Sequence, residues 1–291
     1  MELTKINKND ITLDKKIYSN NGIDTMLGKN CNKDIIIKKV SNDDADIDLN
    51  DEAYILQKLG NDNDYIIKYY GCLIKDDKVI GILMEYLKYG TLDEYLKINY
   101  HNKINLNFIN KLILKICQGI KYLHQQGIFH NDIKTTNIMF VDKDYENIKI
   151  IDFGSSGTKD IFPFPGTYSA PEMTQDIYFK LYEEYVVEKN IKTNDDFFPP
   201  FYDKNDVFQL GFLIWDLFHY PQDYPFINNQ ENQSYENWQQ IFQNSENEML
   251  KKINKNIPDV YKYIIQSCWK YNMFERITIT EIIEILENKI F

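Results

Sequence analysis

The chain has 291 residues, of which 43% are hydrophobic and 14% aromatic, and it carries a formal net charge of −11. This length and apolar content can bury a sizeable core, as one unit of two lobes or as two small domains. The acidic balance argues against nucleic acid or an anionic membrane surface as the main partner.

The cysteines indicate a reducing compartment. Cys31, Cys72, Cys117 and Cys268 are far apart and form no CxxC pair, so we expect reduced thiols. No apolar run approaches the length of a membrane span, and residues 1–16 are too polar for a secretory signal. We therefore expect a soluble, intracellular and cytoplasmic protein.

The N-terminal third is predicted to form a small sheet with one helix. Residues 1–16 are polar and form either an extension or a first strand. The acidic run 43–52 leads into a helix over 51–59, because acidic residues stabilise a helix N-terminus. Rich β-branched content predicts strands over 35–40, 66–73 and 79–85.

The strand at 35–40 carries two consecutive lysines. Side chains alternate along a strand, which places Lys38 with Ile36 on one face and Lys39 with Ile37 on the other. A single strand lysine is usually solvated, so the strand alone assigns no function to either.

The C-terminal part is predicted to be mainly helical. Residues 106–124 form an amphipathic helix with Gly127 as its cap. Residues 206–218 are apolar nearly all round, which predicts a helix buried at the centre of the larger lobe. Thr278 and Glu281 have the spacing of a capping box for a last helix.

Residues suited to phosphoryl transfer are concentrated at 130–137, which reads His-Asn-Asp-Ile-Lys-Thr-Thr-Asn. Asp132 could accept the proton of an attacking hydroxyl, and Lys134 could neutralise the moving phosphate. Asn137 and Asp152 offer the oxygen ligands that suit Mg²⁺. Strands at 137–141 and 148–151, joined by a turn, would place these two ligands at the ends of one hairpin.

These residues, with Asp152-Phe153-Gly154, resemble the catalytic loop and metal motif of the eukaryotic protein kinase superfamily. Residues 166–172, Gly-Thr-Tyr-Ser-Ala-Pro-Glu, are similar to its peptide-docking signature, which small-molecule kinases lack. The resemblance runs from Ile17 to the C-terminus. It implies an α+β bilobal protein kinase fold with a small antiparallel-sheet N-lobe, one main N-lobe helix, and a larger, mostly helical C-lobe.

The resemblance divides the chain into an extension at 1–16, an N-lobe with hinge at 17–87 and a C-lobe at 88–291. Residues 173–204 form an insertion after Ala-Pro-Glu. The insertion is either a surface segment packed by its own aromatic residues or an element that docks substrate.

The resemblance also implies an ATP site. Lys38 aligns with the phosphate-binding lysine, with Lys39 as the alternative, and Glu52 aligns with the glutamate that pairs with it. Only Gly22 remains of the glycine loop, so we expect that loop to close less tightly over ATP. The remaining cofactor-binding residues implied are Ile36 as the adenine roof, Met84 as gatekeeper, the backbone of Glu85 and Leu87, and Met139.

Several catalytic-loop roles follow from the same resemblance. The hydroxyl of Thr167 is expected to bridge Asp132 and Lys134. His130 is expected to pack beneath the loop, and Asp206 to hold the loop backbone.

Asn131 stands where the family carries an arginine that binds a phosphate on the activation loop. Its presence predicts activity without such phosphorylation. The only arginine of the chain is Arg276, which aligns with the arginine that pairs with the glutamate of Ala-Pro-Glu, here Glu172. A lysine cannot imitate that planar, bidentate fork.

Two functions remain open. The first is a serine/threonine protein kinase that uses ATP and Mg²⁺; Lys134 and Thr167 favour Ser/Thr over Tyr, and the acidic balance points to basic protein substrates. The second is a pseudokinase that binds nucleotide as a signalling scaffold, which the eroded glycine loop and Ile36 favour. The sequence does not indicate the substrate, the regulator or the oligomeric state.

Overall fold

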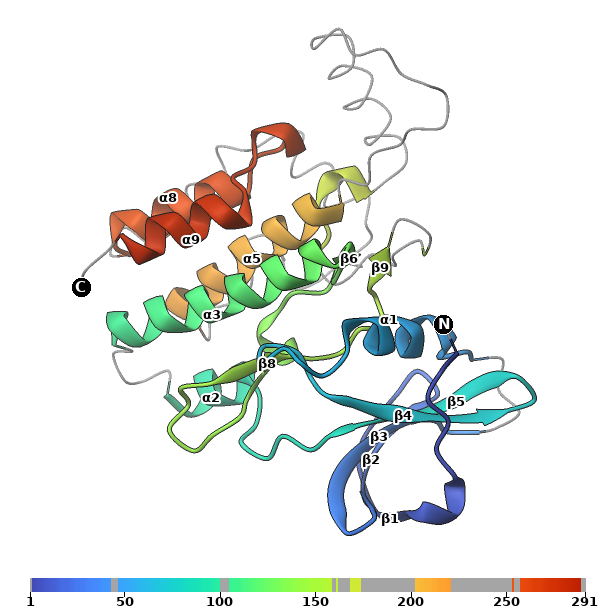
Figure 1. The fold of residues 1–291 in the computed structure, drawn as a ribbon. Coiled ribbons are helices and arrows are strands. Elements are labelled where there is room, and N and C mark those ends of the chain that lie inside the picture. The colour runs from blue at the N-terminus through green and yellow to red at the C-terminus, as the bar shows by residue number, and fades with distance from the viewer. Residues whose placement is uncertain are drawn as a thin grey trace, which may run out of the picture.

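The computed structural model describes residues 2–42, 47–99, 105–158, 161, 168–173, 202–220, 253 and 257–288. They form a small lobe built on an antiparallel sheet and a larger, mostly helical lobe (Figure 1). The expected bilobal α+β fold is confirmed. No helix among these residues is long and apolar enough to cross a bilayer.

The small lobe contains a five-stranded antiparallel sheet in the order β1-β2-β3-β5-β4. Its strands are β1 (Ile11–Asn20), β2 (Ile23–Asn30), β3 (Lys33–Val40), β4 (Tyr69–Lys75) and β5 (Lys78–Glu85). Because β1 begins at Ile11, the sheet takes in part of the segment 1–16 whose role as extension or first strand was open.

The connection from β1 to β2 is a tight two-residue hairpin. Asn21 and Gly22 both have positive φ, of 47° and 76°. A turn with positive φ at both central residues matches the right-handed twist of the flanking strands, and Asn-Gly is its preferred sequence. The predicted glycine-loop region is therefore a β-hairpin with a two-residue turn, and its ladder has register shifts at Leu13/Lys15 and Lys16/Tyr18.

Helix α1 (Asn50–Leu59) packs against β4 and β5 of this sheet. Its apolar residues Ile55, Leu56 and Leu59 are buried, as the helical spacing predicted. The strand expected from residue 66 begins three residues later, at Tyr69. Ile67 instead donates its backbone N–H to Ile150 of the large lobe at 3.1 Å, so this part of the segment links the lobes.

The large lobe is built from five α-helices among the described residues, together with two short two-stranded sheets, β6-β9 and β7-β8. Helix α3 lies against α9, and α5 against α8 (Figure 1). Its elements are α2 (Leu92–Asn99), α3 (Leu106–Gln125), β6 (Ile128–Phe129), β7 (Ile138–Phe140), β8 (Ile148–Ile150), β9 (Gly157–Thr158), α5 (Tyr202–His219), α8 (Asp259–Cys268) and α9 (Ile279–Glu287).

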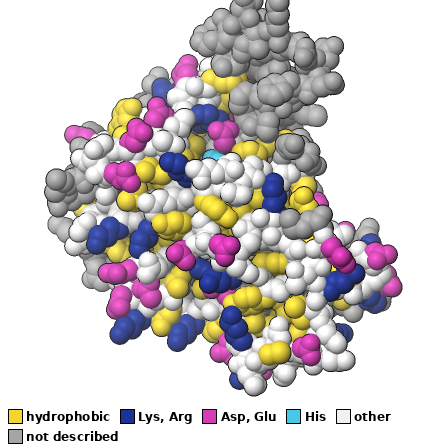
Figure 2. All heavy atoms as spheres, viewed as in Figure 1, with side chains coloured by type: hydrophobic (Ala, Val, Ile, Leu, Met, Phe, Trp, Pro, Cys, Tyr) yellow, Lys and Arg dark blue, Asp and Glu magenta, His cyan; other side chains and the backbone are white. Residues whose placement is uncertain are grey.

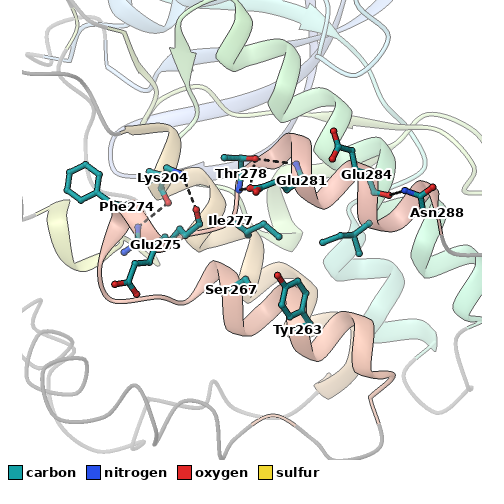
Figure 3. A pocket seen from close by; sticks show the side chains of 12 residues that line it. Lys204, Tyr263, Ser267, Phe274, Glu275, Ile277, Thr278, Glu281, Glu284 and Asn288 are labelled. Atoms are coloured by element: carbon teal, nitrogen blue, oxygen red, sulfur yellow. Dashed lines mark hydrogen bonds between the residues drawn. The ribbon is translucent and has the colours of Figure 1, made fainter. Parts of the chain in front are cut away.

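The sequence signals for these helices are confirmed. Every apolar position of the predicted stripe on α3 is buried, and α5 is buried along nearly its whole length. Thr278 and Glu281 form the capping box of α9, drawn as dashed lines in Figure 3. Helix α5 contacts β6 and lies beneath the segment that follows it.

Candidate active site

Lys38 connects the two lobes. Its Nζ lies 2.9 Å from Oε1 of Glu52 on α1 and 2.8 Å from Oδ1 of Asp152, which follows β8. Lys38 and Ile36 share one face of β3, whereas Ile35 and Ile37 are buried in a separate cluster. This geometry distinguishes Lys38 from Lys39 and joins three residues that lie far apart in the sequence.

Charge pairing controls the ionisation of this group. Burial alone lowers the pKa of Lys38, but Glu52 and Asp152 outweigh it, so the pKa is raised. Burial raises the pKa of Glu52 against the opposing effect of Lys38. Burial also acts to raise the pKa of Asp152, yet the Lys38 ammonium dominates and lowers it. Asp152 is therefore a carboxylate at neutral pH.

The backbone after β8 turns sharply at Asp152, whose φ is 63°. Aspartate is among the residues that adopt this left-handed region more readily. Its side chain is 46% exposed even though it contacts Lys38, so one side of the carboxylate faces solvent.

Lys134 and Asn137 of the catalytic loop both hold the carboxylate of Asp132. The Nζ of Lys134 lies 2.6 Å from Oδ2, and the side-chain amide of Asn137 donates to the same oxygen at 2.9 Å. The Asn137 amide also donates to the main-chain oxygen of Asp132 at 2.8 Å. Because its nitrogen points at Asp132, the amide oxygen of Asn137 points away from it.

His130 and Asp206 support the loop from beneath. His130 lies with its Nε2 3.0 Å from the carbonyl oxygen of Ile151, and its ring packs edge-on against Phe153. Asp206 accepts hydrogen bonds from the main-chain N–H groups of His130 at 3.0 Å and Asn131 at 2.7 Å. The predicted structural roles of His130 and Asp206 are confirmed.

Most of the residues expected to surround the adenine lie on the small-lobe sheet or directly after it. Ile36 is opposite Met84 in the β3-β5 register, and Met84 and Leu87 are buried. Met139 lies on β7 and forms an isolated bridge with Thr91. Their roles in nucleotide binding remain predictions.

Sequence reasoning missed an ion pair at the hinge. The carboxylate of Glu85 accepts the main-chain N–H of Lys68 at 2.7 Å and pairs with the ammonium of Lys149, which is only 4% exposed. The available signal was a lysine in the middle of the apolar strand β8. This pair ties the hinge to the strand that precedes Asp152.

The structure gives Gly22 a requirement that does not depend on a ligand. Its carbonyl accepts the N–H of Ser41 at 2.8 Å, and an added Cβ would lie 2.6 Å from the Ile47 side chain. The positive φ of the turn adds to this constraint. Phosphate binding by Gly22 therefore remains a prediction.

Two predicted features lie outside the described residues. Thr167, expected to bridge Asp132 and Lys134, is one of them, and most of the insertion at 173–204 is the other. The end of the docking signature is described, and there Glu172 is buried and binds Arg276 as predicted.

A cavity of about 770 Å³ lies elsewhere in the large lobe, between α8, α9 and the chain that joins them (Figure 3). Lys204, Tyr263 and Glu284 are among its lining residues. No predicted catalytic or nucleotide-binding residue reaches it. The candidate active site is therefore the region where Lys38, Asp152 and the catalytic loop converge.

The surface seen in Figure 2 mixes charges. Acidic and basic side chains are interspersed on this face, and hydrophobic side chains lie between them. The net negative charge is thus not gathered there into one patch.

The comparisons with known proteins agree with this geometry. Residues 18–286 match the family described as protein tyrosine and serine/threonine kinase. The match covers most of the chain, and the chain belongs to this family.

Curated relatives are similar at modest identity. The chain is 24% identical to serine/threonine-protein kinase STY46 of Arabidopsis thaliana over 98% of its length, which is 45% of that protein. It is 31% identical to serine/threonine-protein kinase sid1 of Schizosaccharomyces pombe over 60% of its length and 38% of the relative. Serine/threonine/tyrosine-protein kinase HT1 of A. thaliana is 26% identical over 81% of the chain and 53% of the relative. The chain thus spans about half the length of these relatives or less.

Proposed function

We propose that the protein is an ATP- and Mg²⁺-dependent serine/threonine protein kinase that transfers the γ-phosphoryl group to protein hydroxyls. The observation that carries this proposal is the contact of Lys38 with both Glu52 and Asp152, close to a catalytic loop that holds Asp132 and Asn137. A scaffold protein would not need all of these charged groups together.

The residues present fit a metal-bound nucleotide. ATP supplies the phosphoryl group, and Mg²⁺ neutralises its charge. The amide oxygen of Asn137 and the carboxylate of Asp152 would hold the metal, because both are hard oxygen ligands and the pKa of Asp152 is lowered. Lys38 would contact phosphate oxygens, and Ile36, Met84, Met139 and the backbone of Glu85 and Leu87 would enclose the adenine.

Asp132 orients the substrate hydroxyl and accepts its proton. Lys134 and the Asn137 amide hold Oδ2 of the Asp132 carboxylate and so fix its orientation. Lys134 adds positive charge beside the reacting phosphate. Lys134 and the predicted position of Thr167 favour Ser/Thr over Tyr, as do the names of most of the relatives.

Activity is proposed not to depend on phosphorylation of the activation segment. Asn131 is fully buried, and its amide donates to the Phe129 carbonyl at 3.0 Å. It therefore offers no exposed cation for a phosphate. Substrates are proposed to be basic, in line with the net charge of −11, and the buried free thiols support a reducing, cytoplasmic location.

The second candidate is a nucleotide-binding scaffold without transfer activity. The observation that favours it is the tight β1-β2 hairpin, which has a single glycine at its tip and a tip carbonyl already bonded to Ser41. Such a hairpin gives phosphates fewer backbone N–H groups than a glycine-rich loop.

The deciding experiment is transfer from labelled ATP with magnesium to a mixed basic protein substrate. We expect transfer by the wild type and its loss in Asp152→Asn, with Asp144→Asn in the exposed β7-β8 turn as a matched control that keeps full activity. Phosphoamino-acid analysis then separates Ser/Thr from Tyr. If wild type transfers nothing yet gains thermal stability from ATP, the scaffold function replaces this proposal.

A further inference from the structure

Three buried side-chain amides, one in the catalytic loop and two on the helix beneath it, contact one another. Asn131, Asn205 and Gln209 are each 0% exposed. Asn205 and Gln209 are four residues apart on α5, which places them on one face of that helix. Asn131 has a φ of 60°, a backbone conformation that asparagine tolerates better than most residues.

Gln209 holds both peptide groups that flank Asp132. Its Nε2 donates to the carbonyl oxygen of Asn131 at 2.7 Å, and its Oε1 accepts the N–H of Ile133 at 2.9 Å. One planar amide therefore fixes the chain before and after Asp132. This contact sets the direction in which the Asp132 side chain leaves the backbone.

Asn205 joins the same loop to the segment that ends in Pro171 and Glu172. Its Nδ2 donates to Oδ1 of Asn131 at 2.9 Å, and its Oδ1 accepts the N–H of Ala170 at 2.8 Å. Ala170 is also fully buried. A continuous set of hydrogen bonds thus runs from Ala170 through Asn205 and Asn131 to Gln209.

The chemistry of these positions requires amides. Each contact uses one donor and one acceptor end of the side chain, and a buried polar group that loses its partner is destabilising. A carboxylate at 205 would bring an oxygen against Oδ1 of Asn131. A carboxylate at 209 would do the same against the Asn131 carbonyl.

We propose that Gln209 and Asn205 are positioning residues of the phosphoryl-transfer reaction: Gln209 fixes Asp132, and Asn205 couples Asp132 to the segment 168–173. The inference rests on the proposed kinase function and deepens it. Displacement of a reacting group by about 1 Å can lower a rate by about 100-fold. The loss of either amide should therefore lower the rate of phosphoryl transfer.

The kinetic test uses the full chain, with a near-isosteric substitution at residue 209 and a truncation at residue 205. Gln209→Glu is expected to lower kcat by about 10- to 100-fold with the KM for ATP unchanged. Asn205→Ala is expected to lower kcat and also to raise the KM for the protein substrate, because Ala170 loses its acceptor. The matched control is Asn110→Ala, a buried amide bonded to Leu286 and Tyr261, which should lower stability and leave kcat unchanged.

A second measurement does not depend on activity. Backbone amide hydrogen exchange should quicken at Ile133 in Gln209→Met and at Ala170 in Asn205→Ala. Each variant should leave the exchange rate at the other site nearly unchanged. If Asn205→Ala does not fold, Asn205→Ser replaces it in both measurements.

The outcomes separate the two proposals. A wild type that transfers no phosphate ends the kinase function, while the exchange pattern still decides whether the amides hold these two backbone sites. An active wild type whose Gln209→Glu and Asn205→Ala variants keep kcat within twofold of the Asn110→Ala control overturns the positioning roles, as does unchanged exchange at Ile133 and Ala170.

Discussion

The guanidinium of Arg276, the only arginine of the chain, binds both carboxylate oxygens of Glu172 through its two terminal nitrogens. Its Nε donates to the carbonyl of Lys270 at 2.8 Å, and the terminal nitrogens also donate to the carbonyls of Lys204 and Tyr271. The group stacks 4.8 Å from the centre of the Phe208 ring. Every N–H of this buried group thus has an acceptor.

Replacement of Arg276 by lysine should therefore be severe although it keeps the charge. An ammonium cannot make the bidentate contact, and each buried carbonyl that loses its guanidinium donor costs about 1–3 kcal/mol. Urea unfolding of Arg276→Lys measures this loss. Lys262→Ala is the control, because its partner Asp259 is 97% exposed and such pairs contribute at most about 1 kcal/mol. Equal losses in the two variants would contradict a structural role for the Arg276 fork.

The sequence predicted those parts of the site whose residue type is itself chemically specific. In three cases the residue type indicates its partner: the lone arginine matched to Glu172, the lysine on β3 opposite a helix glutamate, and the capping box at Thr278. The sequence does not indicate the partners of Asn131, Asn205 and Gln209, because an isolated amide is as compatible with the surface as with the core. Their meaning depends on contacts between residues more than 70 positions apart in the sequence.

Strand boundaries were also beyond the sequence. Residues 66 and 67 have the composition of a strand, yet Ile67 pairs with Ile150 of the large lobe instead of with the sheet. Strand β1, at the edge of the sheet, is mostly exposed: its alternate apolar residues Ile11, Leu13 and Ile17 stand among polar ones and are not buried in the core. Composition describes what a residue can pair with, whereas tertiary contact decides which partner it takes.

Lys38, and not Lys39, should be required for phosphoryl transfer. Lys38→Met removes the cation between Glu52 and Asp152 and should lower kcat by about 100-fold or more. Lys39→Met, on the opposite face of the same strand, should stay within about threefold of wild type. Steady-state kinetics of both variants decide between the lysines, and the reverse order of effects would assign the phosphate contact to Lys39.

Activity should survive complete dephosphorylation. The Asn131 side chain is already bonded to Phe129 and Asn205, so the loop has its partners without a phosphate. We expect phosphatase-treated protein, shown by intact mass to carry no phosphate, to keep at least half of its initial rate. Mock-treated protein is the control, and a fall of tenfold or more would show that phosphorylation is required.

The N-terminal segment, residues 2–6, is tied to both α1 and β4. Gln57 of α1 accepts the N–H of Thr4 at 2.8 Å and donates to the carbonyl of Glu2 at 2.7 Å. Cys72 exchanges backbone hydrogen bonds with Thr4 and Ile6, each of 2.9 Å. At Gly71 an added Cβ would lie 2.6 Å from Ile6, so only glycine lets this segment approach β4.

Gly71→Ala should therefore destabilise the protein through that segment. The expected loss is about 2 kcal/mol or more, from the clash with Ile6 together with the strain of a positive φ. In a variant lacking residues 2–6 the clash is absent and only the strain remains, so the same substitution should cost less. Urea unfolding of the four proteins forms a double-mutant cycle. Strictly additive losses would show that the segment does not press on Gly71.

The last prediction concerns the β1-β2 hairpin that stands in place of a glycine loop. Asp24 on β2 is 6% exposed; its Oδ2 lies 2.7 Å from Nζ of Lys16, and its Oδ1 accepts from the Ser19 hydroxyl at 2.6 Å. The hydrogen bond from Lys16, followed by that from Ser19, lowers the pKa of Asp24 from 3.8 to about 2.

Because the pKa is lower in the folded protein, Asp24 stabilises the fold above pH 3.8 and loses this effect as the pH falls through about 2. The difference in unfolding free energy between wild type and Asp24→Asn should thus be largest near neutral pH and narrow steadily below pH 4. Added salt should also reduce it, since Lys16 is 51% exposed. Urea unfolding at several pH values measures the difference, and one that is independent of pH would show that the carboxylate charge does not hold the hairpin closed.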